Sequence, residues 1–225
     1  MILLGKKLII KIIRQFAYIC LMVAVITGDI IHSAKMKPRQ WMSKLKTALG
    51  KFGTTPDNWE VYRGDAFQLE IKDVSKALWI AIHLKAMLKA TPGLDARMSI
   101  GFGRKDFKAK KISQANGSAF VNAGHKFDML KTEKVNMAIY SGKEKFDDEM
   151  NLFLKFALTF MDSWTATSAA LVNVFMSNPA KTQSEIAALL KINQSAVSQR
   201  KKRAHFDLIE DLDKHFKQRI KEALA

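Results

Sequence analysis

The segment from Thr182 to Arg203 constrains the fold more than any other part of the chain. Thr182 is followed three residues later by Glu185, and this spacing is typical of a capping box at the start of a helix. The helix then has one compact apolar face, formed by Ile186, Ala187, Leu189 and Leu190. A short turn at 191–193 precedes a second helix. The pattern therefore predicts a helix-turn-helix.

The second helix of this segment has the composition of a DNA-reading helix. Val197 is its inward residue, and its outward residues are small or polar, as entry into the major groove requires. The predicted base-reading residues are Gln194, Ser195, Ser198 and Gln199. The predicted phosphate contacts are Arg200, Lys201, Lys202 and Arg203. The alternative is a helical bundle used for dimerisation, with a solvated basic face.

The charge of the whole chain points in the same direction. A net charge of +16 over 225 residues favours polyanionic partners, namely nucleic acid, nucleotides or an anionic membrane surface. The alternative is a lysine-rich organism whose proteins are basic in general. The length predicts one or two domains. The single Cys20 excludes an internal disulfide framework and fits a reducing cytoplasm, so we expect a cytoplasmic protein.

Residues 1–21 form a basic, apolar leader. Lys11, Arg14 and Gln15 interrupt its apolar core, which argues against a signal peptide. The apolar run 16–27 is too short for a membrane span, which takes about 20 residues. We therefore interpret the leader as an extension upstream of the true start at Met22, with an amphipathic surface helix as the alternative.

Residues 22–145 alternate between strand and helix patterns. The predicted order is a strand at 23–27, a helix at 38–51, a hairpin of strands 59–62 and 67–71, a helix at 74–90, a strand at 96–101, a helix at 117–130 and a strand at 135–140. This order predicts a mixed sheet with helices packed on one side. The fold class is thus α+β, with a sheet domain followed by an all-α domain.

Residues 146–225 have a different texture and form the second predicted domain. The stretch 147–178 is helical nearly throughout and predicts one long connecting helix that ends at Pro179. After the helix-turn-helix, residues 205–224 continue as an amphipathic helix, which suits either internal packing or a homodimer.

Two aspartates stand out in the predicted sheet domain. Asp29 ends the first strand and Asp65 lies in the hairpin turn. Carboxylates at neighbouring strand ends can hold Mg²⁺ against a nucleotide triphosphate. If a helix begins directly after the first strand, backbone amides would cradle phosphate, and these belong to Ile30, Ile31 and His32. The alternative is that an aspartate beside a glycine is an ordinary turn residue.

Four segments resemble the SatD family. They are ITGDIIHS at 26–33, YRGDAF at 62–67, RMSIG at 97–101 and NGSAF at 116–120. Members of that family begin near the position of Met22 and end in a helix-turn-helix, so the resemblance covers almost the whole chain after residue 21. It implies a two-part architecture more than a particular chemistry.

The first domain is more distantly similar to the ferredoxin-like palm of class III nucleotide cyclases and GGDEF proteins. Those enzymes carry a metal-binding Asp-Ile after the first strand and a metal-binding Gly-Asp in the hairpin, and Asp29-Ile30 and Gly64-Asp65 match them. Their Val-Asn-x-Ala-x-Arg helix, whose Asn and Arg stabilise the transition state, resembles 121–126. The resemblance implies that Asn122 and Lys126 would be the catalytic residues of an enzyme.

The chain departs from the cyclase pattern at three points. Lys126 keeps the charge of the arginine but loses its bidentate geometry. Gly117 is one residue further from Asn122 than in cyclases, and Val61 stands at the base-selecting position, where it cannot hydrogen-bond a purine. We therefore predict a DNA-binding regulator of the SatD type whose palm-like domain binds a nucleotide with Mg²⁺. The alternatives are a cyclase-like or nucleotidyltransferase enzyme carrying a helix-turn-helix, and a membrane-associated protein anchored by 1–21.

Overall fold

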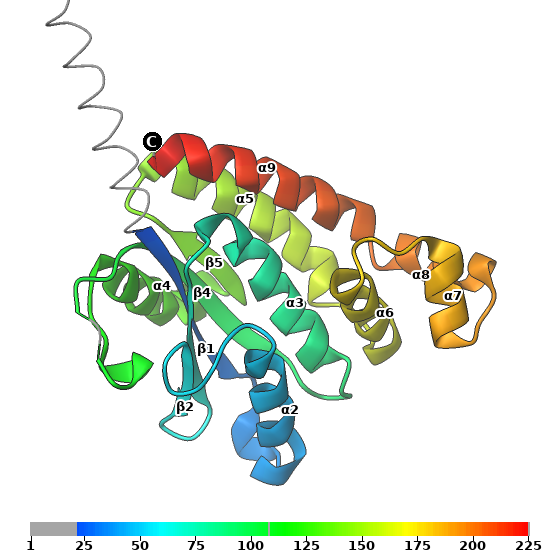
Figure 1. Cartoon of the computed structure of the whole chain (residues 1–225), viewed down its shortest axis with the longest axis horizontal. Helices are drawn as coiled ribbons and strands as arrows, with labels where there is room; N and C mark the ends of the chain where they lie inside the picture. Colours follow the sequence, from blue (N-terminus) through cyan, green and yellow to red (C-terminus); the bar gives the residue numbers. More distant parts are fainter. Residues whose placement is uncertain (1–21, 108, 225) are drawn as a thin grey trace, which may run out of the picture.

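A five-stranded mixed sheet forms the centre of the protein (Figure 1). The computed structural model describes residues 22–107 and 109–224, so the interpretations of the leader 1–21 lie outside the described part. The strands are β1 (Met22–Ile30), β2 (Trp59–Tyr62), β3 (Ala66–Ile71), β4 (Ala96–Arg104) and β5 (Met137–Tyr140). Their order is β2-β3-β1-β4-β5, with β5 parallel to β4 and all other neighbours antiparallel. The predicted α+β class and mixed sheet are confirmed.

Eight helices with α labels surround this sheet within the described residues. They are α2 (Pro38–Gly50), α3 (Ala77–Lys89), α4 (Ser118–Glu133), α5 (Glu144–Met161), α6 (Ala166–Ser177), α7 (Gln183–Leu190), α8 (Gln194–Arg203) and α9 (Phe206–Leu224). Short 3-10 turns at Ser33–Lys35, Val74–Lys76 and Ile112–Gln114 complete the elements. None of these helices combines the length and the apolar content that a membrane crossing requires in the parts of the chain that the structure describes.

Helices cover both faces of the sheet, which corrects the one-sided packing predicted above (Figure 1). Val25 packs with α4 on one face, whereas Ala24 and Ile26 point into the larger cluster under α3, α5 and α9. Glycines in β4 make the α4 face flat, since a Cβ at Gly101 would lie 2.2 Å from the Ala123 nitrogen. The alternation of Gly101 and Gly103 with large residues was the sequence signal for this second layer.

The predicted long helix 147–178 is wrong, because residues 162–165 divide it into α5 and α6. The Thr165 side chain accepts a hydrogen bond from the Ser168 amide at 3.2 Å and so caps α6. Trp164 is buried in the break, and its indole nitrogen donates to the Ala204 carbonyl at 3.1 Å. The break thereby attaches the α5–α6 turn to the end of α8. It carries no Gly or Pro, which explains why the pattern concealed it.

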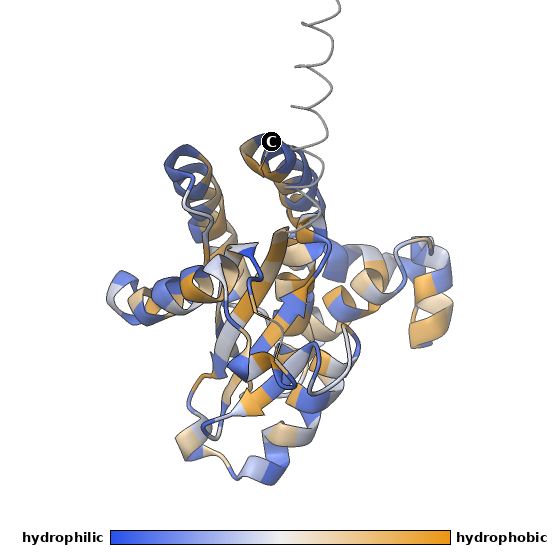
Figure 2. Cartoon of the chain, turned by 60° about the vertical axis from the view of Figure 1, so that its left-hand side comes forward, coloured by the Kyte–Doolittle hydropathy of each residue, from blue (hydrophilic) through white to orange (hydrophobic). Residues whose placement is uncertain are grey.

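One continuous hydrophobic cluster extends from Met22 in β1 to Leu224 in α9. It includes residues on both sides of the predicted domain boundary near residue 145, for example Phe102 in β4 and Phe216 in α9, whose rings lie 5.9 Å apart. Figure 2 shows the outer helices as alternating orange and blue along their length, the pattern of helices that bury one side only.

Candidate functional site

Helices α7 and α8 project at one end of the molecule and are joined by a three-residue turn (Figure 1). At the start of α7, Thr182 and Glu185 form the predicted capping box, with the Thr182 amide 2.7 Å from Glu185 Oε2. This backbone hydrogen bond lowers the pKa of the Glu185 carboxyl below its ordinary value. Lys191 ends α7 in a left-handed conformation. Asn193 caps α8, because its side-chain oxygen accepts a hydrogen bond from the Ala196 amide at 2.7 Å.

Helix α8 separates an inward residue from an exposed polar face. Val197 is fully buried against α7, whereas the predicted base-reading residues are all exposed, namely Gln194, Ser195, Ser198 and Gln199. Spacings of four residues place Gln194 and Ser198, and likewise Ser195 and Gln199, along one side of the helix. Lys202 and Arg203 are exposed at its end, and neither makes an ion pair with the residues that the structure describes. Arg200 is half-buried.

Lys201 differs from its basic neighbours, and its predicted role as a phosphate contact needs correction. Its ammonium pairs with Asp207 and, at 3.3 Å, with Glu210, and it lies 5.6 Å from the ring centre of Phe206. Partial burial lowers the pKa of Lys201, but the hydrogen bonds to Asp207 and Glu210 outweigh this effect and raise the pKa above its ordinary value. Lys201 therefore joins α8 to α9 and does not point outward.

The two predicted metal ligands lie near each other, and both have partners within the chain. The register pairs Gly28 of β1 with Phe67 of β3, which places Asp29 beside the hairpin that carries Asp65. Asp29 lies within β1, opposite Arg97 of β4, and the guanidinium binds both carboxylate oxygens. The Ser33 hydroxyl donates a hydrogen bond to Asp65. A metal ion would have to compete with these partners.

The predicted phosphate cradle is not formed as expected, because one of its amides is already used. Ile30 belongs to β1, and the Ile31 amide donates to the Asp95 carbonyl at 2.9 Å. His32 adopts a left-handed conformation before a single 3-10 turn, and the first α-helix begins only at Pro38. The end of β1 therefore lacks a helix whose N-terminus could face a phosphate.

Asn122 and Lys126 lie on α4, which packs on β4, β1 and β5, and within the described residues neither bonds to the two aspartates. The Asn122 amide donates to the Phe102 carbonyl at 2.7 Å, and the mostly buried Lys126 pairs with Glu133 at 2.7 Å. The side chain that meets Asp29 is Arg97, which the sequence analysis left without a role. Among the described residues, no group of three or more His, Cys, Asp or Glu side chains is placed to hold a metal ion.

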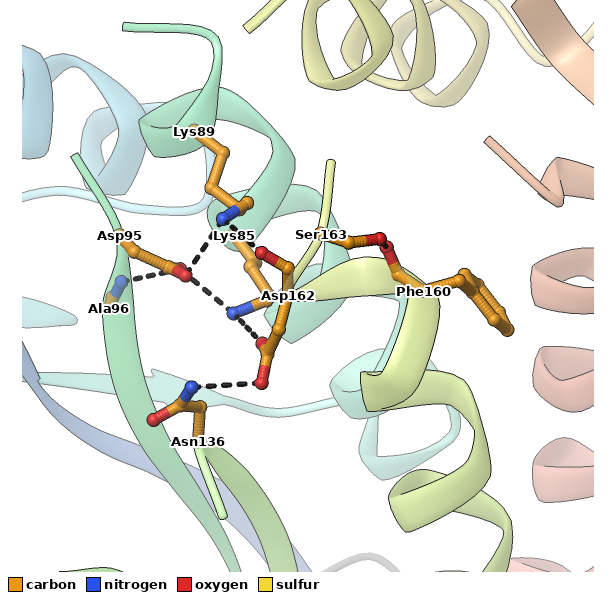
Figure 3. Close-up of polar contacts among 8 residues, drawn as sticks. All are labelled: Lys85, Lys89, Asp95, Ala96, Asn136, Phe160, Asp162 and Ser163. Atoms are coloured by element: carbon orange, nitrogen blue, oxygen red, sulfur yellow. Dashed lines mark hydrogen bonds and ion pairs between the residues drawn. The ribbon is translucent and has the colours of Figure 1, made fainter. Parts of the chain in front are cut away.

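A buried ionic cluster, which the sequence analysis missed, lies between the sheet and the C-terminal helices (Figure 3). The Lys85 ammonium is fully buried and lies 2.8 Å from Asp95 Oδ1 and 2.7 Å from Asp162 Oδ1. Lys89 binds the other Asp95 oxygen at 3.0 Å, and the Asn136 amide donates to Asp162 at 2.9 Å. The cluster ties the starts of β4 and β5 to the α5–α6 turn. Its sequence signal was Lys85 in the middle of the mainly apolar run of α3.

The comparisons add no relative to this picture: no protein-family model matches the chain, and no curated protein matches it. The fold and the sites define an α+β protein with a projecting helical pair whose polar and basic side chains are exposed. Its function must therefore be argued from the chemistry of these residues.

Proposed function

We propose that this chain is a DNA-binding regulatory protein of the SatD type, in which α7 and α8 form a helix-turn-helix. The observation that carries the proposal is the exposed polar side of α8, which is followed by two unpaired cations within the described residues, Lys202 and Arg203. In such a motif the second helix enters the major groove with its N-terminal residues at the base edges. Gln194 and Ser195 occupy that first turn of α8.

The chemistry of α8 fits both parts of DNA recognition. Glutamine and serine side chains can hydrogen-bond base edges, and lysine and arginine bind phosphates without reading sequence. The net charge of +16 adds a long-range attraction for a polyanion. The internal pairing of Lys201 supports the proposal further, because it connects α8 to α9, and a helix that is already positioned has a smaller ordering cost on binding.

A salt series on a labelled 40-base-pair duplex of random sequence tests the phosphate contacts. We expect the double change Lys202→Ala and Arg203→Ala to weaken binding and to lower the slope of log K against log salt by about 2. The matched control is Lys143→Ala with Lys145→Ala, two exposed lysines at the distant end of α5. Equal slopes for the wild type and the α8 variant would remove α8 from the interface.

Base reading needs a separate experiment. A preferred duplex is first selected from random sequences with the wild-type protein. Gln199→Ala is then expected to lose about 1–3 kcal/mol of discrimination against altered bases while binding random DNA as before. Ser184→Ala, an exposed change on α7, is the control. A selection that yields no preferred sequence would contradict base reading by α8.

A second candidate function is Mg²⁺-dependent nucleotide binding by a palm-like sheet domain. The succession β1-α2-β2-β3-α3-β4 with strand order 2-3-1-4 supports it, because this is a ferredoxin-like connectivity. The adjacency of Asp29 and Asp65 supports it as well. Binding there requires that Asp29 exchange Arg97 for the metal.

Calorimetric titration with Mg²⁺ alone and with Mg²⁺ and ATP tests this second function. We expect ATP binding that needs Mg²⁺ and that Asp65→Asn abolishes, with the exposed Asp57→Asn as control. Mass spectrometry of the same mixtures separates a sensor, which leaves ATP intact, from a cyclase-like or nucleotidyltransferase enzyme. The same weak heat for the wild type and Asp65→Asn would leave Asp65 as a turn residue.

A further inference from the structure

Helices α5 and α9 share an exposed apolar surface on the outside of the molecule. Phe153, Phe156 and Phe160 of α5 and Leu208 of α9 line a groove of about 320 Å³. Phe156 is 64% exposed, Leu208 53% and Phe153 40%, and Leu152, one helical turn before Phe156, is 53% exposed. These five residues are called the α5–α9 apolar surface below.

The fold itself does not explain this surface. The inward side of α9 is already used within the chain, where Ile209, Phe216 and Ile220 are fully buried. The amphipathic pattern that suggested either packing or a homodimer is therefore satisfied by packing. Leu208 and the phenylalanines of α5 point the other way. A contiguous group of exposed aromatic side chains on a globular protein marks an interaction site.

We propose that the α5–α9 apolar surface binds a second copy of this chain about a two-fold axis. The charges at its margin carry this choice of partner. Asp211 is exposed on α9 and lines the groove, and Lys155 is exposed on α5 beside Phe156. In a two-fold interface the same surface meets itself, so α9 of one copy can face α5 of the other and bring Asp211 against Lys155.

The same charges argue against the other partners that a basic protein attracts. The exposed carboxylate of Asp211, which lines the groove, disfavours DNA and anionic membranes at this place. Elsewhere the net charge of +16 makes two copies repel each other, so a surface with both signs of charge is the favourable place for self-association. Apolar cores with charged margins are the usual anatomy of such interfaces.

The position of the surface gives the dimer a role. Leu208 lies five residues after Arg203, the last residue of α8, so a pair joined here carries two α8 helices on one assembly. Dimeric helix-turn-helix proteins read two half-sites spaced by about one helical turn of DNA. This consequence rests on the proposed DNA-binding function, whereas the dimer itself does not.

Sedimentation equilibrium of the full chain without DNA tests the dimer. We expect a wild-type dimer at micromolar concentration and an at least 100-fold weaker association for Phe156→Glu. Since Phe156 is largely exposed, circular dichroism and thermal unfolding should show that the variant is folded. The control Val121→Glu changes an exposed apolar residue on α4 and should leave the dimer intact.

A charge-reversal pair tests the arrangement within the dimer. Lys155→Asp or Asp211→Lys alone should weaken association several-fold, and the two changes together should restore it. A wild-type chain that stays monomeric at all concentrations overturns the proposal, as does a Phe156→Glu variant that dimerises like the wild type. Because DNA is absent from these experiments, their failure is distinguishable from a failure of DNA binding.

Discussion

Two regions carry the polar residues on which the proposed functions rest: the exposed face of α8, and the pair Asp29 and Asp65. The side chains of the first region are exposed to solvent, whereas those of the second are bonded within the chain. Ser198 and Gln199 on α8 are exposed, and their side chains make no hydrogen bond within the described residues. Gln194 and Ser195 bond only inside the helical pair, to Gln183 at 3.0 Å and to Asn193 at 2.9 Å. Asp29 is held by Arg97, and Asp65 accepts a hydrogen bond from Ser33. A surface of the first kind can bind a partner without rearrangement. A site of the second kind must first give up internal bonds, and that cost reduces its affinity.

A series of contacts runs between these two regions. The Ile31 amide binds the Asp95 carbonyl, and the Asp95 carboxylate reaches Asp162 through Lys85. Two residues further along the chain, Trp164 binds the carbonyl at the end of α8. The ionic cluster of Figure 3 is thus placed to make the sheet and the helical pair one cooperative unit.

The largest effect is expected where the two regions meet. Lys85→Ala leaves Asp95 and Asp162 without the buried cation that lies between them, and we expect the free energy of unfolding to fall by about 3–5 kcal/mol. Urea unfolding followed by circular dichroism measures the loss, and the exposed Lys76→Ala is the control. A loss below about 1 kcal/mol would mean that the cluster does not hold the regions together.

The substitution Asp29→Asn tests whether Asp29 is a structural residue, a metal ligand or both. It removes the charge-assisted bonds from Arg97, and we expect the free energy of unfolding to fall by about 2 kcal/mol without added metal. If Asp29 is also a metal ligand, millimolar Mg²⁺ with ATP should raise the melting temperature of the wild type and not that of the variant. Equal Mg²⁺ effects on both proteins would make Asp29 a purely structural residue.

Two adjacent lysines test the comparison within α8. Lys201→Ala should lower the free energy of unfolding by about 1 kcal/mol, because it removes the ion pairs and the ring contacts that hold α8 on α9. Lys202→Ala should leave stability unchanged and lower the salt slope of DNA binding by about 1. Urea unfolding measures the stability of both variants, and the duplex salt series measures their DNA binding. Identical behaviour of the two variants would show that burial does not separate their roles.

The smallest effect concerns His83, which packs α3 against α6 below the helical pair. Burial lowers the pKa of His83 below its ordinary value of 6.5, an effect larger than the opposing hydrogen bond that the His83 ring donates to the Asn173 side-chain oxygen. The unfolded chain therefore binds the proton more readily, and stability falls as the pH drops below about 6.5. The slope should stay under about 1.4 kcal/mol per pH unit for one proton. Urea unfolding of His83→Gln at a series of pH values should show no such dependence of stability on pH. An unchanged slope in this variant would mean that other groups cause it.

Much of the local structure was predictable because its causes lie within a few residues. The capping box at Thr182 and the helix that begins at Pro38 have local signals, and the predicted strands agree with the structure to within a few residues. The break between α5 and α6 was not predictable. Its stabilising contact, from Trp164 to Ala204, crosses forty residues of sequence.

The sequence by itself therefore determined the α+β class, the order of the strands along the chain and the capping box of α7. Only the tertiary structure decided which polar side chains are engaged. Asp29 meets Arg97 because the register of β1 and β4 places them opposite each other, and Lys201 turns inward because α9 folds back beneath α8. The reason is physical: hydrogen-bonded turns act over neighbouring residues, whereas the burial and pairing of a charge depend on residues that are distant in sequence.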